Sequence, residues 1–208
     1  TGVQTCALPI FEIQICKMEA SDYVWSATSY ETFIDGYCNQ RENRKVKSVR
    51  SYNGMIYPKF LASSPLATPC IVIKKEVFDK NKELMFNEKM RYGQDSNLWL
   101  QIAVQYPILA IDEVLTKVRL RGDNAGKRAV VQIKSTCNGW KYLCENKNKF
   151  NIKKLSLIHI TGYKFSCVGS LIINYLEKKK LTQNQLEIIA KILYLCPWLL
   201  FKIASKMG

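Results

Sequence analysis

Near residue 124 the pattern of the sequence changes, and this change limits the possible folds more than any other feature. Before it, short β-branched and aromatic runs alternate with segments of helical periodicity. After it, strand signals stop and only helical periodicity remains. A chain of 208 residues suits one domain, or one domain with an appendage, and can bury a sizeable core. We therefore predict an α/β part followed by an all-helical part.

The predicted elements follow from these periodicities. Phe11, Ile15 and Met18 stand at helical spacing and indicate a first helix over 11–20. The remaining predictions for the α/β part are a strand over 23–31, an edge strand over 46–49, a strand over 70–73, a short helix over 75–79, a helix over 95–106, and one or two strands over 108–120 interrupted at 112–113. Three helices are then predicted, over about 125–147, 154–178 and 182–206.

Positive charge is concentrated in the second half of the chain. Residues 1–104 hold 13 Lys or Arg and 11 Asp or Glu, whereas residues 105–208 hold 18 and 6. Most of the net charge of +14 therefore belongs to the predicted helical part. Such asymmetry indicates an anionic partner, which can be nucleic acid, anionic lipid or a phosphorylated ligand.

The cysteines and the single histidine do not indicate a metal site. The eight cysteines include no C-x-x-C pair, and His159 lies in an apolar stretch without acidic or Cys neighbours. We expect reduced thiols in a cytoplasmic protein, and a packed rather than a ligating histidine. The longest charge-free runs near the C-terminus, 165–176 and 192–201, have 12 and 10 residues. A membrane span needs about 20, so we predict none.

Asp95 is the acidic residue with the most informative surroundings. It follows Gly93 in "RYGQDSNLWLQIA", at the start of a predicted helix. An Asp at a helix start commonly caps the helix by accepting hydrogen bonds from its first N–H groups. From the residues alone we favour this cap. A carboxylate at the end of a loop is also well placed to act as a general base.

Several segments in order resemble the family 2 glycosyltransferases, which have the GT-A fold. "YGQDSNLWLQIA" is similar to the family block G-E-D-x-x-L-W-L-R-L-A. "ATPCIVIKKEVFDK" and "FNEKMRYGQD" precede it as in the family, and "IDEVLTKVRLRGDNAG" follows it. Upstream, "FEIQICKMEASDYVWSATSYE" resembles the segment that begins L-E-K-Q-I. The resemblance covers about residues 11–126. It implies a partial GT-A-type (nucleotide-diphospho-sugar transferase) α/β sheet with flanking helices, followed by a basic helical subdomain over 127–208.

The same resemblance implies that part of the catalytic domain is missing. In the family, the L-E-K-Q-I helix follows an Asp-rich motif that holds a divalent metal, Mg or Mn, and the sugar nucleotide. Here only ten residues precede Phe11, and none is acidic. We therefore interpret the chain as a C-terminal fragment without the nucleotide-binding half and without metal ligands, inactive by itself. The stretch "TGVQTCALPI" (1–10) resembles a translated sequencing-adaptor read-through, and we interpret it as a non-native leader.

The resemblance also assigns roles along the helix that begins near residue 95. Asp95 becomes the catalytic base, a role that can coexist with capping. Gln94, where the family more often has an acid, keeps hydrogen-bonding reach and becomes a candidate for positioning the acceptor sugar. Trp99 is a candidate platform for sugar stacking, although its place in the L-W-L run favours core packing.

Three further substrate-binding candidates lie outside this helix. Arg119 matches a family arginine, and Arg121 stands where the family often has a histidine. Two residues apart on a strand, they face the same side. They can either contact diphosphate oxygens or form a solvated strand end, and the two interpretations are equally supported. Thr68 is a candidate acceptor contact, with a structural turn at Pro69 as the better-supported alternative.

The implied function is inverting transfer of a sugar from a nucleotide-activated donor to a hydroxyl of a glycan or lipid-linked acceptor, in cell-envelope polysaccharide synthesis. The implied location is the cytoplasm or, peripherally, the inner face of the membrane. Lysines between aromatic and aliphatic residues near the C-terminus are typical of segments at an anionic membrane surface, and equally of an ordinary helical subdomain with solvated lysines.

Two non-catalytic alternatives remain. One is a basic nucleic-acid- or membrane-binding module, although no nucleic-acid recognition motif is present and we expect no specific nucleic acid. The other is a fragment that merely adopts part of the fold.

Overall fold

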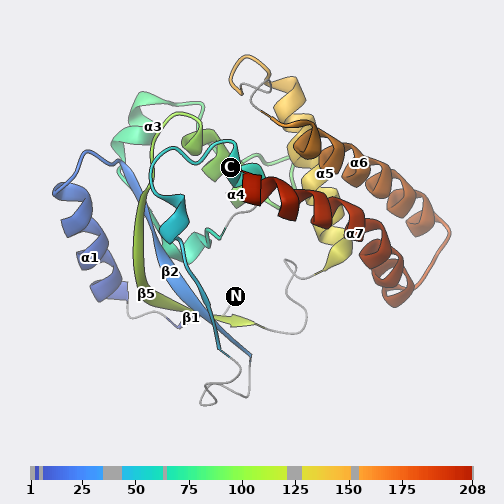
Figure 1. The fold of residues 1–208 in the computed structure, drawn as a ribbon, viewed down its shortest axis with the longest axis horizontal. Coiled ribbons are helices and arrows are strands. Elements are labelled where there is room, and N and C mark those ends of the chain that lie inside the picture. Colours follow the sequence, from blue (N-terminus) through green and yellow to red (C-terminus); the bar gives the residue numbers. More distant parts are fainter. Residues whose placement is uncertain are drawn as a thin grey trace. The chain divides into compact units, whose positions relative to one another are not determined.

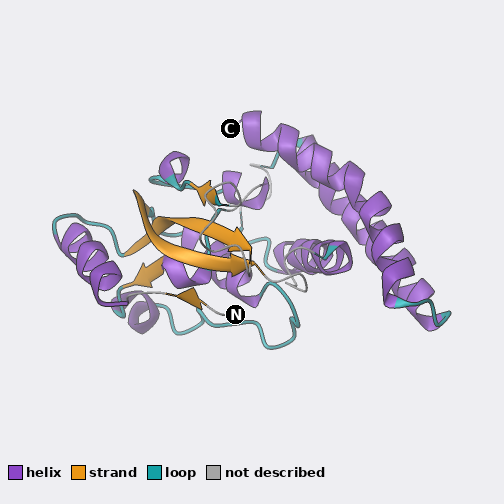
Figure 2. Ribbon diagram, turned by 90° about the horizontal axis from the view of Figure 1, so that it is seen from below, coloured by secondary structure: helices purple, strands orange, loops and turns teal. Residues whose placement is uncertain are grey.

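The computed structural model describes residues 3–4, 7–34, 44–62, 65–120, 128–150 and 155–207. The chain forms two compact units. The first unit comprises residues 1–57, 64–85 and 98–122, and the second comprises residues 58–63, 86–97 and 123–208. Among the described residues, the strands belong to the first unit and the three longest helices to the second (Figure 2). The predicted mixed α/β class, with helices after the strands, is confirmed.

The first unit contains one five-stranded mixed sheet in the order β1-β5-β2-β3, and β4 also pairs with β2. The strands are β1 (Val3–Gln4), β2 (Trp25–Ile34), β3 (Lys45–Lys47), β4 (Ile71–Ile73) and β5 (Leu109–Leu120). The two long strands, β2 and β5, run parallel at the centre, and the other pairs are antiparallel (Figure 1). β2 is rich in Thr and aromatic residues, which favour a strand.

The predicted interruption of the strand over 108–120 is a bulge within β5. Ile111 pairs with Thr28, Val114 with Ser29 and Thr116 with Tyr30. Asp112, Glu113 and Leu115 are therefore extra residues on β5. Extra residues on one strand bend it and redirect its side chains. β5 therefore continues as one strand, with Asp112 displaced from the regular alternation.

α1 (Ala7–Glu19) packs on the sheet, but not through the predicted apolar face. Phe11 and Ile15 are exposed, whereas Met18 is buried together with Ile10 and Gln14. Ile10, Gln14 and Met18 follow one another at intervals of four residues, which places them on one face of the helix. On this inward face, the Ser26 hydroxyl on β2 donates a buried hydrogen bond to Gln14 Oε1 at 2.8 Å. Hydrophobic spacing alone could not reveal this polar anchor.

Short elements connect the sheet to the rest of the chain. They are two 3₁₀ helices, η2 (Arg50–Tyr52) and η3 (Thr68–Cys70), and the α-helices α2 (Lys59–Ala62), α3 (Glu76–Lys80) and α4 (Gln94–Ala103). α4 contributes its first four residues to the second unit and the remainder to the first.

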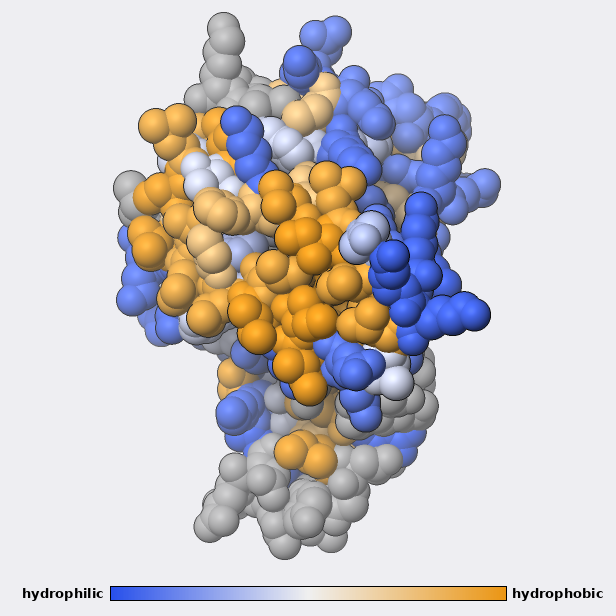
Figure 3. All heavy atoms as spheres, turned by 90° about the vertical axis from the view of Figure 1, so that its right-hand side faces the viewer, coloured by the Kyte–Doolittle hydropathy of each residue, from blue (hydrophilic) through white to orange (hydrophobic). Residues whose placement is uncertain are grey.

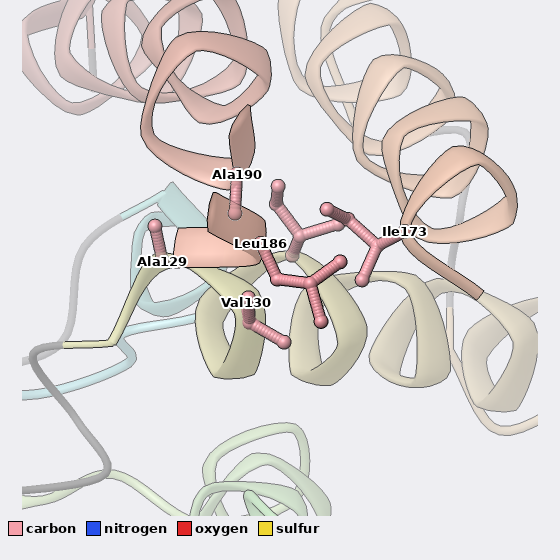
Figure 4. Close-up of a cluster of buried hydrophobic side chains, with 6 residues drawn as sticks. Ala129, Val130, Ile173, Leu186 and Ala190 are labelled. Atoms are coloured by element: carbon pink, nitrogen blue, oxygen red, sulfur yellow. The ribbon is translucent and has the colours of Figure 1, made fainter. Parts of the chain in front are cut away.

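The second unit is built around α5 (Ala129–Glu145), α6 (Leu157–Lys178) and α7 (Gln183–Met207). α6 and α7 form a hairpin, and α5 packs against both. Figure 4 shows apolar side chains from all three helices meeting in one cluster. Its buried members are Ala129, Val130, Ile133, Ile173, Leu186 and Ala190. All three predicted helices are confirmed, each beginning one to four residues later than expected.

α7 corrects the prediction that no segment suits a membrane span. Residues Gln183–Lys206 are long enough and apolar enough to cross a membrane by length and composition, and only 22% of their most apolar window is buried. Counting charge-free residues missed this helix because Lys191 and Lys202 interrupt the apolar run.

Candidate functional site

The loop before α4 reaches the helix through a position that requires glycine. Gly93 has a φ of +77°, a left-handed conformation that L side chains rarely adopt. A Cβ at this position would also overlap the Ser135 hydroxyl oxygen on α5. The Gly93 carbonyl accepts a hydrogen bond from Asn97 N at 2.9 Å. Gly93 therefore immediately precedes α4 and accepts its first helical hydrogen bond.

Asp95 lies one residue inside the helix rather than at its cap. Gly93 takes the capping position, Gln94 is the first helical residue and Asp95 the second. The Asp95 carboxylate accepts a hydrogen bond from the N–H of the next residue, Ser96, at 2.8 Å, whereas a capping side chain accepts from the N–H two or three residues later. The side chain is partly exposed, and the positive end of the helix dipole favours a carboxylate there. Asp95 is therefore a partly exposed carboxylate in the first turn of α4 and not its capping residue.

Gln94 and Trp99 make mainly structural contacts. Gln94 Nε2 donates to the Met90 carbonyl oxygen, which ties the side chain back to the preceding loop. Trp99 follows Asp95 by four residues but is only 6% exposed, within a run of buried residues that continues through Leu100. Its indole Nε1 has no hydrogen-bond partner among the described residues. Trp99 therefore fits the packing interpretation better than a sugar platform.

Thr68 and Arg119 belong to the first unit, whereas Gln94 and Asp95 belong to the second. Thr68 is exposed at the start of η3, and its carbonyl accepts a hydrogen bond from Ile71 N, which supports a structural turn. Arg119 is partly buried near the end of β5 and pairs in register with Phe33. The prediction for Arg121 lies outside the described residues.

Asp112 is an acidic residue whose environment the sequence did not reveal. Ser48 Oγ donates to its Oδ1 at 2.6 Å, and Ser29 Oγ donates to the same oxygen at 2.8 Å. These two hydrogen bonds, with the nearby charge of Arg50, hold the pKa of Asp112 below its ordinary value. A carboxylate stabilised in this way is a weak base. Asp112 therefore secures the β5 bulge to β2 and to the segment after β3.

His159 is buried in the first turn of α6, in agreement with the prediction of a packed residue. Its Nδ1 lies 2.8 Å from the hydroxyl of Ser156, which caps the helix, and burial lowers the pKa of the ring. Among the described residues, no three His, Cys, Asp or Glu side chains gather where they could hold a metal ion. The described residues therefore do not supply a ligand set for the divalent metal that the sequence resemblance implies.

Comparisons with known proteins point to one class of enzyme. No family model matches the chain, and no solved structure matches it. Proteins from Rickettsia bellii and Rickettsia felis, both named as uncharacterized glycosyltransferases, are 31% and 32% identical over 115 and 113 residues. The matches cover 54% and 53% of this chain but only 15% and 17% of those proteins. The chain is thus similar, over about half of its length, to a small part of proteins named as glycosyltransferases.

Proposed function

We propose that this chain is part of a family 2 glycosyltransferase and that Asp95 is its catalytic base. The observation that carries the proposal is the position of Asp95. It is partly exposed in the first turn of α4, after a glycine that the backbone requires. The similarity to proteins named as glycosyltransferases supports the enzyme class.

In the proposed reaction, the Asp95 carboxylate removes the proton from an acceptor hydroxyl while that oxygen attacks the anomeric carbon of the donor sugar. The bond from the anomeric carbon to the nucleoside diphosphate breaks, and its electron pair leaves with the diphosphate. Attack opposite the leaving group inverts the anomeric centre. A hydroxyl is a poor nucleophile at neutral pH, so a placed base contributes about 10²- to 10⁴-fold to the rate.

Other residues are proposed for binding rather than for proton transfer. Arg119 and Arg121 are candidates for the diphosphate oxygens, because guanidinium groups bind such oxygens bidentately. Gln94 and Thr68 are candidates for the acceptor. The divalent metal, the lipid-linked or glycan acceptor, the cell-envelope role and the cytoplasmic location stay predictions.

The experiment uses the whole protein that carries these residues. Release of nucleoside diphosphate is measured with UDP-glucose, UDP-galactose, UDP-N-acetylglucosamine and GDP-mannose, with and without Mg²⁺ or Mn²⁺. We expect Asp95→Asn to lower kcat by about 10²-fold or more. Folding should not change, because the Asn amide oxygen can still accept from Ser96 N. The matched control is Asp79→Asn, because Asp79 is an exposed acid that forms a surface ion pair with Lys82.

A fully active Asp95→Asn enzyme would remove Asp95 from the mechanism and overturn its assignment as the base. An Asp79→Asn enzyme that loses as much activity would show that the effect is not specific to residue 95. Absence of turnover with every donor would count against the proposed enzyme class itself.

A further inference from the structure

α6 buries four small residues beside Tyr163 and Ile173 on its inward face, and it exposes six other large apolar residues. A helix at the surface of a protein in water normally exposes polar and charged residues instead. The small buried residues are Gly162, Ser166, Gly169 and Ser170. The exposed apolar residues are Leu157, Phe165, Val168, Leu171, Ile172 and Tyr175.

The inward glycines and serines allow the helices to approach closely. A Cβ on Gly162 would come within 3.1 Å of the Phe201 ring on α7, and one on Gly169 within 3.4 Å of Ile133 on α5. The Ser166 hydroxyl donates to the Gly162 carbonyl, so it needs no partner on another helix. Small residues between helices, with large apolar residues outside, are typical of helices packed in apolar surroundings.

α7 adds a second apolar stripe to the same helical hairpin. Its exposed members recur every three or four residues and so lie on one face of the helix. They are Ile188, Ile192, Leu195, Trp198, Leu199 and Ile203. We call this set, with the exposed apolar residues of α6, the α6–α7 face. Figure 3, which views the side where both helices lie in Figure 1, shows a broad apolar surface beside hydrophilic side chains.

The charged side chains that lie among the apolar residues of the α6–α7 face are lysines. Lys164 lies within the α6 stripe, and Lys191, Lys202 and Lys206 alternate with the apolar residues of α7. Lys202 Nζ lies 4.8 Å from the centre of the Trp198 ring, which pairs a cation with an amphipathic aromatic side chain. The exposed stripe residues named above include no acid. Lysine, tryptophan and exposed aliphatic residues together match the boundary between lipid headgroups and acyl chains.

We propose that the α6–α7 face lies in the interface of an anionic lipid bilayer, with both helices parallel to the membrane plane. The other side of α7 is already engaged, because Leu186 and Ala190 pack against α5 and Glu187 accepts hydrogen bonds from the first N–H groups of α5. A membrane-spanning α7 would carry α5 or these polar contacts into hydrocarbon, which is costly. The proposal is independent of the role of Asp95.

Charge and apolarity distinguish this partner from two others. A nucleic-acid surface should present lysines to phosphates, whereas the α6 stripe holds six large apolar residues around Lys164. A second copy of the chain would bring the same lysines and no acid to a two-fold contact, so these lysines would gain no opposite charge. Anionic lipid satisfies both the lysines and the apolar side chains.

The first test is flotation of the 208-residue chain with vesicles of phosphatidylcholine containing 30% phosphatidylglycerol, and with pure phosphatidylcholine. Leu171 and Val168 are 68% and 54% exposed, so their replacement should not disturb folding, which circular dichroism can verify. We expect Leu171→Gln and Val168→Gln each to weaken binding about tenfold. The matched control is Val46→Gln on β3, since Val46 is 59% exposed. Lys191→Gln and Lys202→Gln should each weaken binding to the anionic vesicles about fivefold at low salt.

The second test uses fluorescence quenching to measure how deeply Trp198 lies in the bilayer. The fluorescence difference between the native chain and Trp198→Phe isolates this residue. Lipids brominated near the headgroup should quench it more than lipids brominated deep in the acyl chain. Stronger quenching by the lipids brominated deep in the acyl chain would indicate a membrane-spanning helix and would overturn the in-plane arrangement.

Three other results would also overturn the proposal. They are no binding to anionic vesicles at low salt, equal weakening by Val46→Gln, and a stable dimer that Leu171→Gln dissociates without any lipid binding.

Discussion

Gly93 and Ser135 lie so close that no side chain can be added at residue 93 without displacing the Ser135 hydroxyl. The contact joins the loop before α4 to α5 within the second unit. Gly93 also has a left-handed φ, and α4 begins at its carbonyl. The position of Asp95 at the start of α4 thus depends on the absence of a side chain two residues earlier.

Gly93→Ala is expected to destabilise the protein for two separable reasons. The left-handed φ costs a non-glycine residue about 1–2 kcal/mol, and overlap with Ser135 adds about 1 kcal/mol or more. Denaturant unfolding of Gly93→Ala, Ser135→Ala and the double variant separates the two. In the double variant, removal of the Ser135 hydroxyl should restore only the part of the stability that the overlap had cost. If Gly93→Ala is as stable as the native protein, residue 93 does not have the left-handed φ. If the double variant is no more stable than Gly93→Ala, residue 93 does not contact Ser135.

The helices and the two long strands could be predicted because their signals are local. Apolar spacing over α5, α6 and α7, and β-branched and aromatic residues in β2, each lie within one element. Strand partners are not local. Nothing near residue 25 indicates that β2 pairs in parallel with β5, more than eighty residues later. The bulge at Asp112 was visible only as a break in the pattern.

The candidate site was less predictable for the same reason. The sequence located Asp95 at the start of a helix, but the choice between capping and the first turn depended on the conformation of Gly93. Gly93 also packs against Ser135, forty-two residues away, and the sequence does not reveal this contact. The inward face of α1 likewise contains a hydrogen bond between Gln14 and Ser26 that apolar spacing does not predict. Polar contacts between distant segments leave no periodic trace in a sequence.

Glu187 provides a second test of the helical unit. Its carboxylate on α7 accepts hydrogen bonds from Ala129 N and Val130 N, the first N–H groups of α5. Loss of a helix cap costs about 1 kcal/mol, so Glu187→Ala should lower the free energy of unfolding by about that amount. Glu187→Gln should cost less, because its amide oxygen can still accept one hydrogen bond. The control is Glu88→Ala, an exposed loop acid of the same unit. Equal effects of Glu187→Ala and Glu88→Ala would contradict the capping role.

The lowered pKa of Asp112 implies that the stability of the folded protein depends on pH. The Ser48 and Ser29 hydroxyls hold its folded-state pKa below the ordinary value. A carboxyl with a lowered folded pKa adds stability above its unfolded pKa of about 4, and that stability is lost as the pH falls through the folded pKa. Ser48→Ala should therefore raise the pKa of Asp112, measured by NMR titration of its carboxyl carbon. Ser21→Ala, whose hydroxyl bonds to backbone carbonyls of α1, should not change it. The same pKa in Ser48→Ala and the native chain would contradict the network.

Trp99 and Trp25 offer a matched pair that separates packing from sugar binding. Both are buried, but Trp25 Nε1 donates to the Tyr106 carbonyl at 3.2 Å, whereas Trp99 Nε1 has no partner among the described residues. Replacing each by Phe removes similar apolar area, but only Trp25→Phe breaks a hydrogen bond, which costs about 1 kcal/mol. Trp99→Phe should therefore be the less destabilising variant in denaturant unfolding.

If Trp99 only packs, Trp99→Ala should cost about 3–5 kcal/mol in stability, while Trp99→Phe should leave the acceptor KM of the whole enzyme unchanged. A stacking platform behaves differently, because a smaller ring binds a sugar less well even when the protein remains stable. A Trp99→Phe enzyme with native stability and a raised acceptor KM would therefore restore Trp99 to the substrate site. That result would also require the buried indole to become accessible during turnover, since its side chain is only 6% exposed in this structure.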